Sequence, residues 1–161
     1  MLVVSDTSPI RALSVIGQVG LIRDIYGGAI LPPDVVSELS VQVPNVPRFV
    51  IDDYPFLHVK MPGNTQRVAE LQSSLGPGEA QAIALALELQ AQAILIDEQQ
   101  GRRVAERLGL KPVGLLAVLS NAKSRGCIAA IAPLVDTLKS RISFRVHPDI
   151  LSRVLRDCGE M

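Results

Sequence analysis

Short apolar runs alternate with longer segments of helical periodicity along most of the chain. The clearest runs are residues 2–5 (LVVS), 29–31 (AIL) and 93–96 (AILI). Short continuous apolar runs are typical of parallel strands covered on both faces, whereas longer segments with apolar positions three and four residues apart predict helices. The pattern therefore predicts an α/β fold in which parallel strands alternate with helices.

The most informative stretch is residues 75–104. The Gly-Pro-Gly at 76–78 predicts a turn, and residues 80–89 predict a helix because this apolar-rich run is too long for one strand. The strand predicted at 93–96 follows, and then a second helix that Gly109 ends. Each junction of this unit carries an acid.

The N-terminus repeats the order of strand, acid and helix. Asp6-Thr7-Ser8-Pro9 follows the strand predicted at residues 2–5. Because proline favours the first helical position, Pro9 predicts Ser8 as the N-cap residue. Asp6 is then left at the strand end without a capping role, and the Thr7 and Ser8 hydroxyls could orient its carboxylate. The following residues 9–26 predict a pair of helices separated at Gly17.

The middle of the chain predicts one regular unit and one irregular segment. Gly27-Gly28 turns into the strand at 29–31, and Pro32-Pro33-Asp34 starts a helix that carries Glu38 one turn in. Residues 41–65 contain four prolines with strand-like pieces near 49–51 and 57–59, which indicates an excursion rather than a domain boundary. A helix is predicted over 65–75. Three aromatic residues in the excursion either pack in the core or stack on bases: Phe49, Tyr54 and Phe56.

The C-terminal third predicts a short strand at 112–113, a helix from Leu115 to Gly126, and amphipathic segments at 134–138 and 150–155. Helices over about residues 130–157 would cover the core or meet a partner. At 161 residues, the chain is expected to form one domain.

Four acids occupy related positions in these predicted elements. Asp6 and Asp97 follow strands, and Glu38 and Glu79 lie near helix starts. Ligands of open α/β sheets bind beyond the carboxyl ends of the strands, and a helix N-terminus favours negative charge. Taken singly, Glu79 or Asp97 could equally serve only a helix start, and Glu38 could be a surface residue.

Composition narrows the class of protein. Apolar residues make up 48% of the chain, aromatic residues 3%, and tryptophan is absent, so leucine, isoleucine, valine and alanine must build the core. No secretory signal or apolar stretch of membrane-spanning length is present, which predicts a soluble cytoplasmic protein with no membrane association. Cys127 and Cys158 have neither metal-ligand nor disulfide spacing, in keeping with a reducing compartment. Phosphate-binding glycine motifs are absent as well.

The net charge is zero but unevenly distributed. Residues 1–98 hold five Lys/Arg against eleven Asp/Glu, a net of minus six, and residues 99–145 hold nine against two, a net of plus seven. These charges either lie on solvated helix faces or place a metal pocket beside a phosphate-binding surface. In the second case Arg102, Arg103 and Arg107 begin the basic segment that would form the phosphate-binding surface, which the family resemblance given below makes an RNA-binding surface.

The acids define the expected chemistry if the fold brings them together. A cluster of Asp6, Glu38, Glu79 and Asp97, with Glu98 adjacent, is unfavourable without a cation. Mg²⁺ or Mn²⁺ takes carboxylate oxygens and keeps several waters, which suits hydrolysis of a phosphodiester.

Five segments resemble the PIN-domain family, and most closely its VapC-like branch known as DUF3368: VSDTSPI at 4–10, LPPDVVSEL at 31–39, GPGEAQAIALALEL at 76–89, AILIDEQQGRRVAERLGL at 93–110 and VGLLAVLSNAKSRG at 113–126. The resemblance implies a three-layer α/β/α domain with a central parallel sheet. It also implies a Mg²⁺- or Mn²⁺-dependent ribonuclease of the toxin–antitoxin type, forming a homodimer and paired with an antitoxin.

Carried over by position, the resemblance makes Asp6, Glu38, Glu79 and Asp97 the catalytic and metal-binding acids. Glu98 becomes a further metal ligand, and Thr7 and Ser8 support Asp6. The competing hypothesis is a catalytically weak scaffold of the same fold that binds a protein partner or RNA without cutting it.

Overall fold

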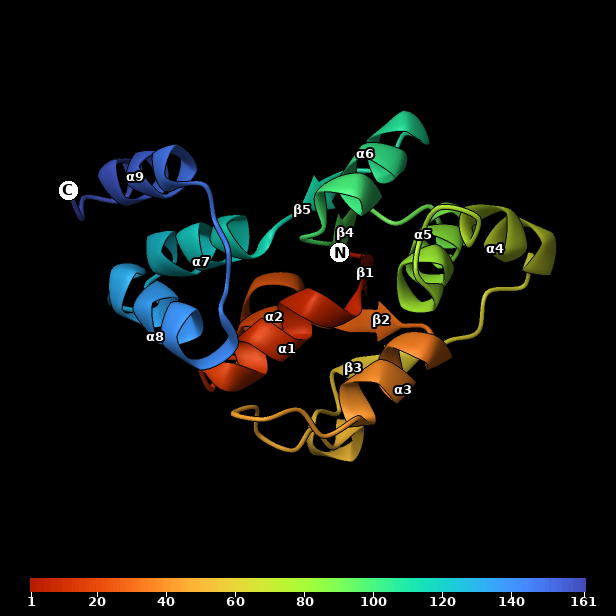
Figure 1. Ribbon diagram of the computed structural model, residues 1–161, viewed down its shortest axis with the longest axis horizontal. Coiled ribbons are helices and arrows are strands. Elements are labelled where there is room, and N and C mark those ends of the chain that lie inside the picture. Colours follow the sequence, from red (N-terminus) through yellow and green to blue (C-terminus); the bar gives the residue numbers. More distant parts are fainter.

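The computed structural model describes residues 1–161 and contains one five-stranded sheet (Figure 1). Its strands are β1 (Val3–Ser5), β2 (Ala29–Leu31), β3 (Leu57–Val59), β4 (Ala93–Leu95) and β5 (Pro112–Val113). All neighbouring pairs are parallel, in the order β3-β2-β1-β4-β5. The alternation of strands and helices expected from the apolar pattern is confirmed.

The helices surround this sheet. They are α1 (Thr7–Val15), α2 (Gly20–Tyr26), α3 (Pro33–Ser40), α4 (Thr65–Leu71), α5 (Pro77–Leu89), α6 (Gln99–Arg107), α7 (Leu115–Ser124), α8 (Ala132–Ile142) and α9 (Pro148–Asp157). The predicted helix pair is separated at Gly17, whose φ of +66° is a conformation that glycine adopts readily.

The sheet separates two apolar cores, because successive strand residues point to opposite faces. Val3 and Leu95 belong to a core of 25 buried residues that α1, α2, α7 and α8 complete. Val4 and Ile94 belong to a second core of 12 residues built mainly by α5. The domain therefore has three layers, α/β/α, as the resemblance implied.

The sequence prediction was wrong at three places. The helix expected over residues 65–75 ends at Leu71, and residues 49–50 form no strand but lead into a 3-10 turn, η1 (Ile51–Asp53). The N-cap position of α1 is Asp6 rather than Ser8, and Pro9 is the third helical residue. The Asp6 carboxylate nevertheless makes no capping hydrogen bond, so it stays available.

The aromatic residues of the excursion pack against one another. The ring centroids of Phe49 and Tyr54 lie 5.3 Å apart, and those of Tyr54 and Phe56 lie 5.9 Å apart. All three contact the larger core, which confirms the packing interpretation over base stacking.

Three C-terminal elements are held together at residue 160. The Glu160 carboxylate accepts hydrogen bonds from the backbone N–H groups of Ile131 (2.7 Å) and Ala132 (2.9 Å) and from Lys123 Nζ (2.9 Å). These donors lower the Glu160 pKa to about 2 against the opposing effect of desolvation. Cys127 and Cys158 are free thiols. None of the helices combines the length and apolar character needed to cross a bilayer.

Candidate active site

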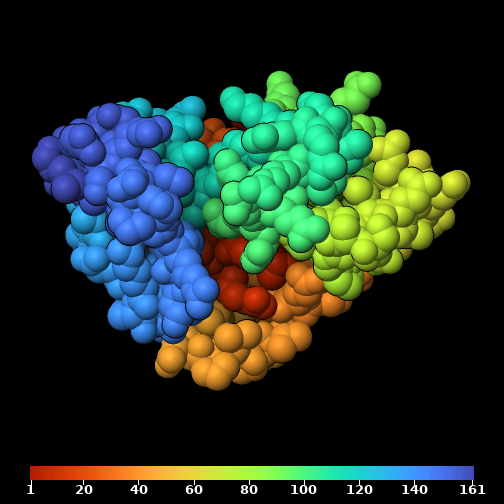
Figure 2. Space-filling model, turned by 45° about the horizontal axis from the view of Figure 1, so that its top comes forward, coloured from red at the N-terminus to blue at the C-terminus, as the bar shows by residue number.

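Strand register brings the two aspartates to the same edge of the sheet. Ser5 pairs with Leu95, and the N–H of Asp6 donates to the carbonyl of Leu95 at 2.9 Å. Asp6 and Asp97 therefore leave adjacent parallel strands at their carboxyl ends, where ligands of such sheets bind. Figure 2 shows a hollow here, with the N-terminal residues (red) at its floor and green, blue and orange segments around it.

Asp6 is the most buried acid, with 2% of its surface exposed. Burial raises its pKa from 3.8 to about 7, and the carboxylates of Glu79, Glu38 and Glu98 raise it further, while the backbone N–H of Thr7 lowers it. No salt bridge involves this group. Asp6 is thus a buried acid whose charge the protein leaves uncompensated.

Glu38 projects from α3 and is tied to three neighbours. The Thr7 hydroxyl donates to its Oε2 atom, and the N–H of Gly78 donates to its Oε1 atom at 3.1 Å. Arg11 donates to its backbone carbonyl at 2.7 Å. Thr7 therefore supports Glu38 through its hydroxyl, rather than Asp6 as the sequence suggested.

Glu79 lies in the first turn of α5, as predicted. Its Oε1 atom accepts from the N–H of Gly76 at 3.3 Å, and its Oε2 atom is buried without any hydrogen-bond partner. Burial raises the Glu79 pKa, the Gly76 N–H lowers it, and the Glu98 and Glu38 carboxylates raise it. An orphaned buried carboxylate oxygen is costly unless a ligand satisfies it.

Asp97 is anchored toward α7. Its Oδ1 atom accepts from the N–H of Leu115 at 2.8 Å. Burial raises the Asp97 pKa, and the Glu98 carboxylate raises it further. The Leu115 N–H and the Arg102 guanidinium lower it in part. Arg102 also donates to the carbonyl of Ile96 at 3.1 Å, so it braces the turn that presents Asp97.

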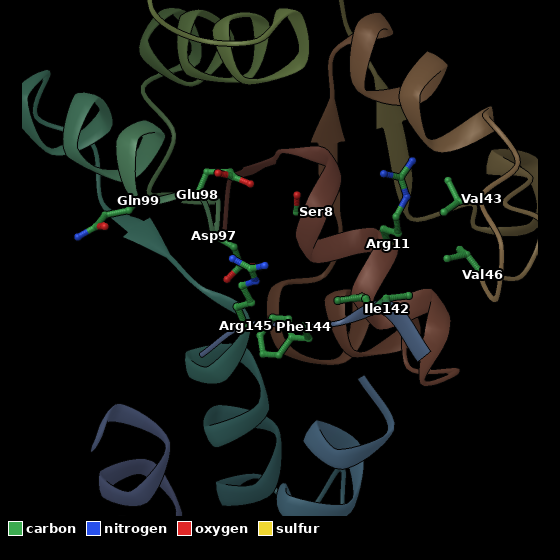
Figure 3. A pocket seen from close by; sticks show the side chains of 11 residues that line it. Ser8, Arg11, Val43, Val46, Asp97, Glu98, Gln99, Ile142, Phe144 and Arg145 are labelled. Atoms are coloured by element: carbon green, nitrogen blue, oxygen red, sulfur yellow. The ribbon is translucent and has the colours of Figure 1, made fainter. Parts of the chain in front are cut away.

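The acids are divided between two adjoining cavities. A cavity of about 160 Å³ is lined by Asp6, Glu38, Glu79 and Glu98 together with Thr7, Ser8, Arg11 and Gly76. Asp97 lines a larger neighbour of about 590 Å³, and Ser8, Arg11 and Glu98 line both cavities (Figure 3). Glu98 therefore lies between the two cavities, whereas the sequence had suggested only that it adds one more metal ligand.

The predicted arginines lie in different surroundings. Arg102 is half-buried and bonded to the β4–α6 turn, whereas Arg103 and Arg107 are exposed on α6 and flank a shallow depression beside Glu106. Sequence reasoning missed Arg11, which reaches both cavities from α1. The sequence could have indicated Arg11 only by its position one helical turn after Thr7 and Ser8, which places the three side chains on one face of the helix.

Glycines let the walls of the site approach closely. A Cβ atom on Gly78 would lie 2.6 Å from Glu38 Oε2, and one on Gly101 would lie 2.7 Å from Glu79 Oε2. A Cβ atom on Gly114 would lie 2.8 Å from the guanidinium of Arg102 and 3.1 Å from Asp97 Oδ1. In the sequence, these close approaches are indicated only by the glycines that stand near the acidic motifs.

Comparison with known families identifies the architecture. The family model DUF3368, described as a PIN domain, matches residues 2–160. The chain belongs to the PIN-domain family. PIN domains commonly have nuclease activity and typically use divalent metal ions.

This PIN domain is also similar to a protein of solved structure. A PilT N-terminus domain protein from the hyperthermophilic archaeon Sulfolobus solfataricus P2 aligns with 17% identity and a TM-score of 0.46, covering 91% of this chain and 98% of that one. No curated protein matches this chain.

The acid cluster has the ligand atoms that a divalent cation prefers, although its side chains do not converge on one point. Three acids with raised pKa values and one orphaned carboxylate oxygen form an oxygen-rich, electron-rich site of the kind that Mg²⁺ and Mn²⁺ prefer. As placed, no three acidic, histidine or cysteine side chains converge on a single point closely enough to ligate one ion. Because Mg²⁺ is usually held by one or two carboxylates with water completing its coordination, these acids remain candidate ligands.

Proposed function

We propose that this PIN domain is a metal-dependent endoribonuclease that hydrolyses RNA phosphodiester bonds. The observation that carries the proposal is the cavity lined by Asp6, Glu38, Glu79 and Glu98, in which Glu79 Oε2 lacks a partner and no cationic side chain pairs with the buried Asp6. Asp97 adjoins it at the end of the neighbouring strand. A cluster of this kind is stable when a cation neutralises it.

We assign the metal to Asp6, Glu79 and Asp97, with Glu38 and Glu98 as further acidic ligands. A bound Mg²⁺ or Mn²⁺ ion would supply an activated water and neutralise charge at a phosphate oxygen. The Thr7 hydroxyl and the Gly78 N–H fix the orientation of Glu38, while Ser8 contributes a hydroxyl at the junction of the two cavities. The N–H of Leu115 orients the Asp97 carboxylate, and Arg102 braces the turn before it through the carbonyl of Ile96.

The positive residues next to this site suit a polyanionic substrate. Arg103 and Arg107 extend from the helix that begins directly after Glu98, and phosphate contacts by such residues position a nucleic-acid backbone. We assign both residues, and the charge of Arg102, to RNA binding.

Cleavage of single-stranded RNA tests the assignment. Purified protein with Mn²⁺ should cut the RNA, and Asp6→Asn or Asp97→Asn should lower the rate by at least about a hundredfold, since both carboxylates hold the reacting groups. Asp136→Asn, on the exposed face of α8, is the matched control and should cut normally. Equal cleavage by all four proteins would contradict the proposal.

The biological role that fits this activity is the toxin of a type II toxin–antitoxin pair in the cytoplasm, as in the VapC-like branch. Induced expression should arrest growth, and Asp6→Asn should abolish the arrest. Co-expression of a protein from the adjacent gene should relieve it and co-purify with the toxin. A homodimer is expected, and sedimentation equilibrium measures it. Normal growth under strong expression of active enzyme would count against the toxin role.

A second candidate is a catalytically weak PIN scaffold that binds RNA or a protein partner. It is favoured by the absence of three convergent ligands and by the hydrogen bonds that already occupy Glu38. Calorimetry with Mn²⁺ separates the two functions. Metal binding that Asp6→Asn abolishes supports the nuclease, whereas RNA binding without any metal binding supports the scaffold.

A further inference from the structure

The larger cavity beside the acid site is assembled from segments that are distant in the sequence. One wall is the start of α1, a second is the segment 43–46, a third is the end of α8 with the two residues after Ser143, and a fourth is the turn after β4. Figure 3 shows Val43, Val46 and Ile142 together on one side and Asp97 and Glu98 on the other, with Phe144 and Arg145 at the lower edge. One end of the cavity is thus apolar and the other is polar.

Arg141 fixes the third wall in place. Its guanidinium donates to the carbonyl of Val15 at 3.2 Å and to the carbonyl of Asn45 at 2.9 Å. The helix α8 ends at Ile142, and Ser143 adopts a φ of 53°. This left-handed residue redirects the chain, so that Phe144 and Arg145 face the cavity.

The second wall is also braced from within. Gln42 Nε2 donates to the carbonyl of Val46 at 3.0 Å and to that of Val43 at 3.3 Å. The same segment receives the guanidinium of Arg141 at Asn45. The two valines therefore form a built surface rather than the side of a free loop.

Composition and size together indicate the ligand. The cavity volume of about 590 Å³ lies within the range of small-molecule sites, roughly 300–1,000 Å³. It combines the half-buried aromatic ring of Phe144, aliphatic side chains and two arginines, Arg11 and Arg145. A nucleotide presents a flat apolar base and an anionic phosphate, which such a lining matches.

The position of the cavity indicates which nucleotide would enter it. Ser8, Arg11 and Glu98 line both this cavity and the acid cavity, so the two adjoin along these three side chains. A strand whose phosphate lies at the acids would place an adjoining nucleotide in the larger cavity. Only an unpaired base could enter, because duplex bases are stacked on their neighbours.

We propose that this cavity is a nucleotide subsite, which binds one unpaired RNA base against Phe144, Val43 and Val46 and its phosphate at Arg145, beside the bond to be cut. A role for the subsite in RNA cleavage rests on the proposed ribonuclease function, but nucleotide binding to it does not. Its occupancy can be measured without metal and without cleavage.

The absence of tryptophan from the chain allows a direct test. Phe144→Trp introduces a single tryptophan in the subsite, and a stacked base should quench its fluorescence. The probe is an unstructured single-stranded RNA of about eight nucleotides in metal-free buffer, with duplex RNA of the same length as comparison. Phe56→Trp is the matched control, since Phe56 is also half-buried but packs against Tyr54 beside β3. Saturable quenching is expected for F144W with single-stranded RNA and for neither the control nor the duplex.

Two further variants measure the contribution to affinity. Phe144→Leu keeps the apolar packing of residue 144 on the core but removes the ring face, and should raise the RNA Kd about tenfold. Arg145→Gln should raise the Kd by a similar factor, whereas Arg153→Gln, an exposed arginine on α9, should leave it unchanged. Melting curves for each variant exclude loss of folding as the cause.

The outcomes separate this inference from the proposed function. If wild-type protein cuts RNA but the fluorescence of F144W and the Kd of F144L do not change, the ribonuclease stands and the subsite is overturned. If F144W responds to RNA but wild-type protein with Mn²⁺ never cuts it, the subsite stands and the nuclease falls. Quenching by an apolar peptide but not by RNA would also overturn the inference, because it identifies a protein-binding groove.

Discussion

Removing the charge of Asp6 should stabilise the protein when no metal is present. The carboxylate is 2% exposed, and its pKa rises from 3.8 in the unfolded chain to about 7 in the folded one. The folded state therefore prefers the protonated acid, and stability falls as pH rises from the unfolded pKa through the folded one. Asp6→Asn keeps the shape and removes the charge, so its stability should not fall in this window.

The size of the effect follows from the shift. One pKa unit corresponds to about 1.4 kcal/mol, so a change from 3.8 to about 7 sets a ceiling of about 4 kcal/mol above pH 7. Relaxation of the site and residual structure in the unfolded chain lower this value, and we expect about 2–4 kcal/mol. Since the whole domain is stabilised by about 5–15 kcal/mol, the gain is easily measured.

Urea unfolding in EDTA at several pH values is the assay. The difference in unfolding free energy between Asp6→Asn and wild type should be small near pH 4, grow by at most about 1.4 kcal/mol per pH unit, and level off above about pH 7. Asp136→Asn controls for loss of a surface carboxylate and should show no such growth. A difference that is absent, or that does not change with pH, would refute the reasoning. Added Mn²⁺ should raise the stability of the wild type and leave Asp6→Asn unaffected.

Three other changes test separate parts of the structure. Arg102→Gln should lower kcat about tenfold and also raise KM, because Arg102 both braces the turn at Asp97 and adds positive charge for RNA, whereas Arg103→Gln should raise KM alone; identical kinetics for the two variants would contradict these roles. Gly101→Ala should weaken Mn²⁺ binding in calorimetry, since its Cβ atom would lie 2.6 Å from Ile96 Cδ1 and 2.7 Å from Glu79 Oε2 and so displace Glu79, while Gly20→Ala, which meets only a flexible arginine, should bind normally. Glu160→Gln should destabilise the protein by about 1–2 kcal/mol near pH 7 in urea unfolding, and the loss should vanish as pH falls from the unfolded pKa of 4.5 toward about 2, because the lowered Glu160 pKa contributes stability only while the group is ionised.

The strands and most helices were predictable from the sequence because their apolar pattern is local. The run at residues 93–96 is buried on both faces of the sheet, which a short continuous apolar segment indicates directly. The start of α1 was not predictable in the same way, because proline suits any position of the first turn and Pro9 occupies the third. The residues after Phe49 form a 3-10 turn, across which Phe49 stacks on Tyr54, and an apolar pattern does not reveal a contact between side chains of this kind.

From the sequence, only the acids that directly follow parallel strands could be predicted to lie at one edge of the sheet. The adjacency of β1 and β4 places Asp6 and Asp97 at one edge, but the division into two cavities depends on side-chain contacts between distant elements. The Thr7 hydroxyl turns to Glu38, which lies 31 residues away in the chain. Sequence position alone made Asp6 the obvious partner of Thr7, since the two are neighbours.

Backbone N–H groups, rather than cationic side chains, hold the carboxylates of this site. Gly78 donates to Glu38, Gly76 to Glu79 and Leu115 to Asp97, and none of these acids forms a salt bridge. An amide satisfies one lone pair and fixes the direction of the carboxylate without neutralising its charge. A lysine or arginine in the same place would stabilise the apo protein but would remove the negative potential that attracts a cation. Gly78 therefore contributes both close approach and charge-neutral anchoring, whereas Gly76 contributes the anchoring alone. The uncompensated charge that remains is what a metal ion would neutralise.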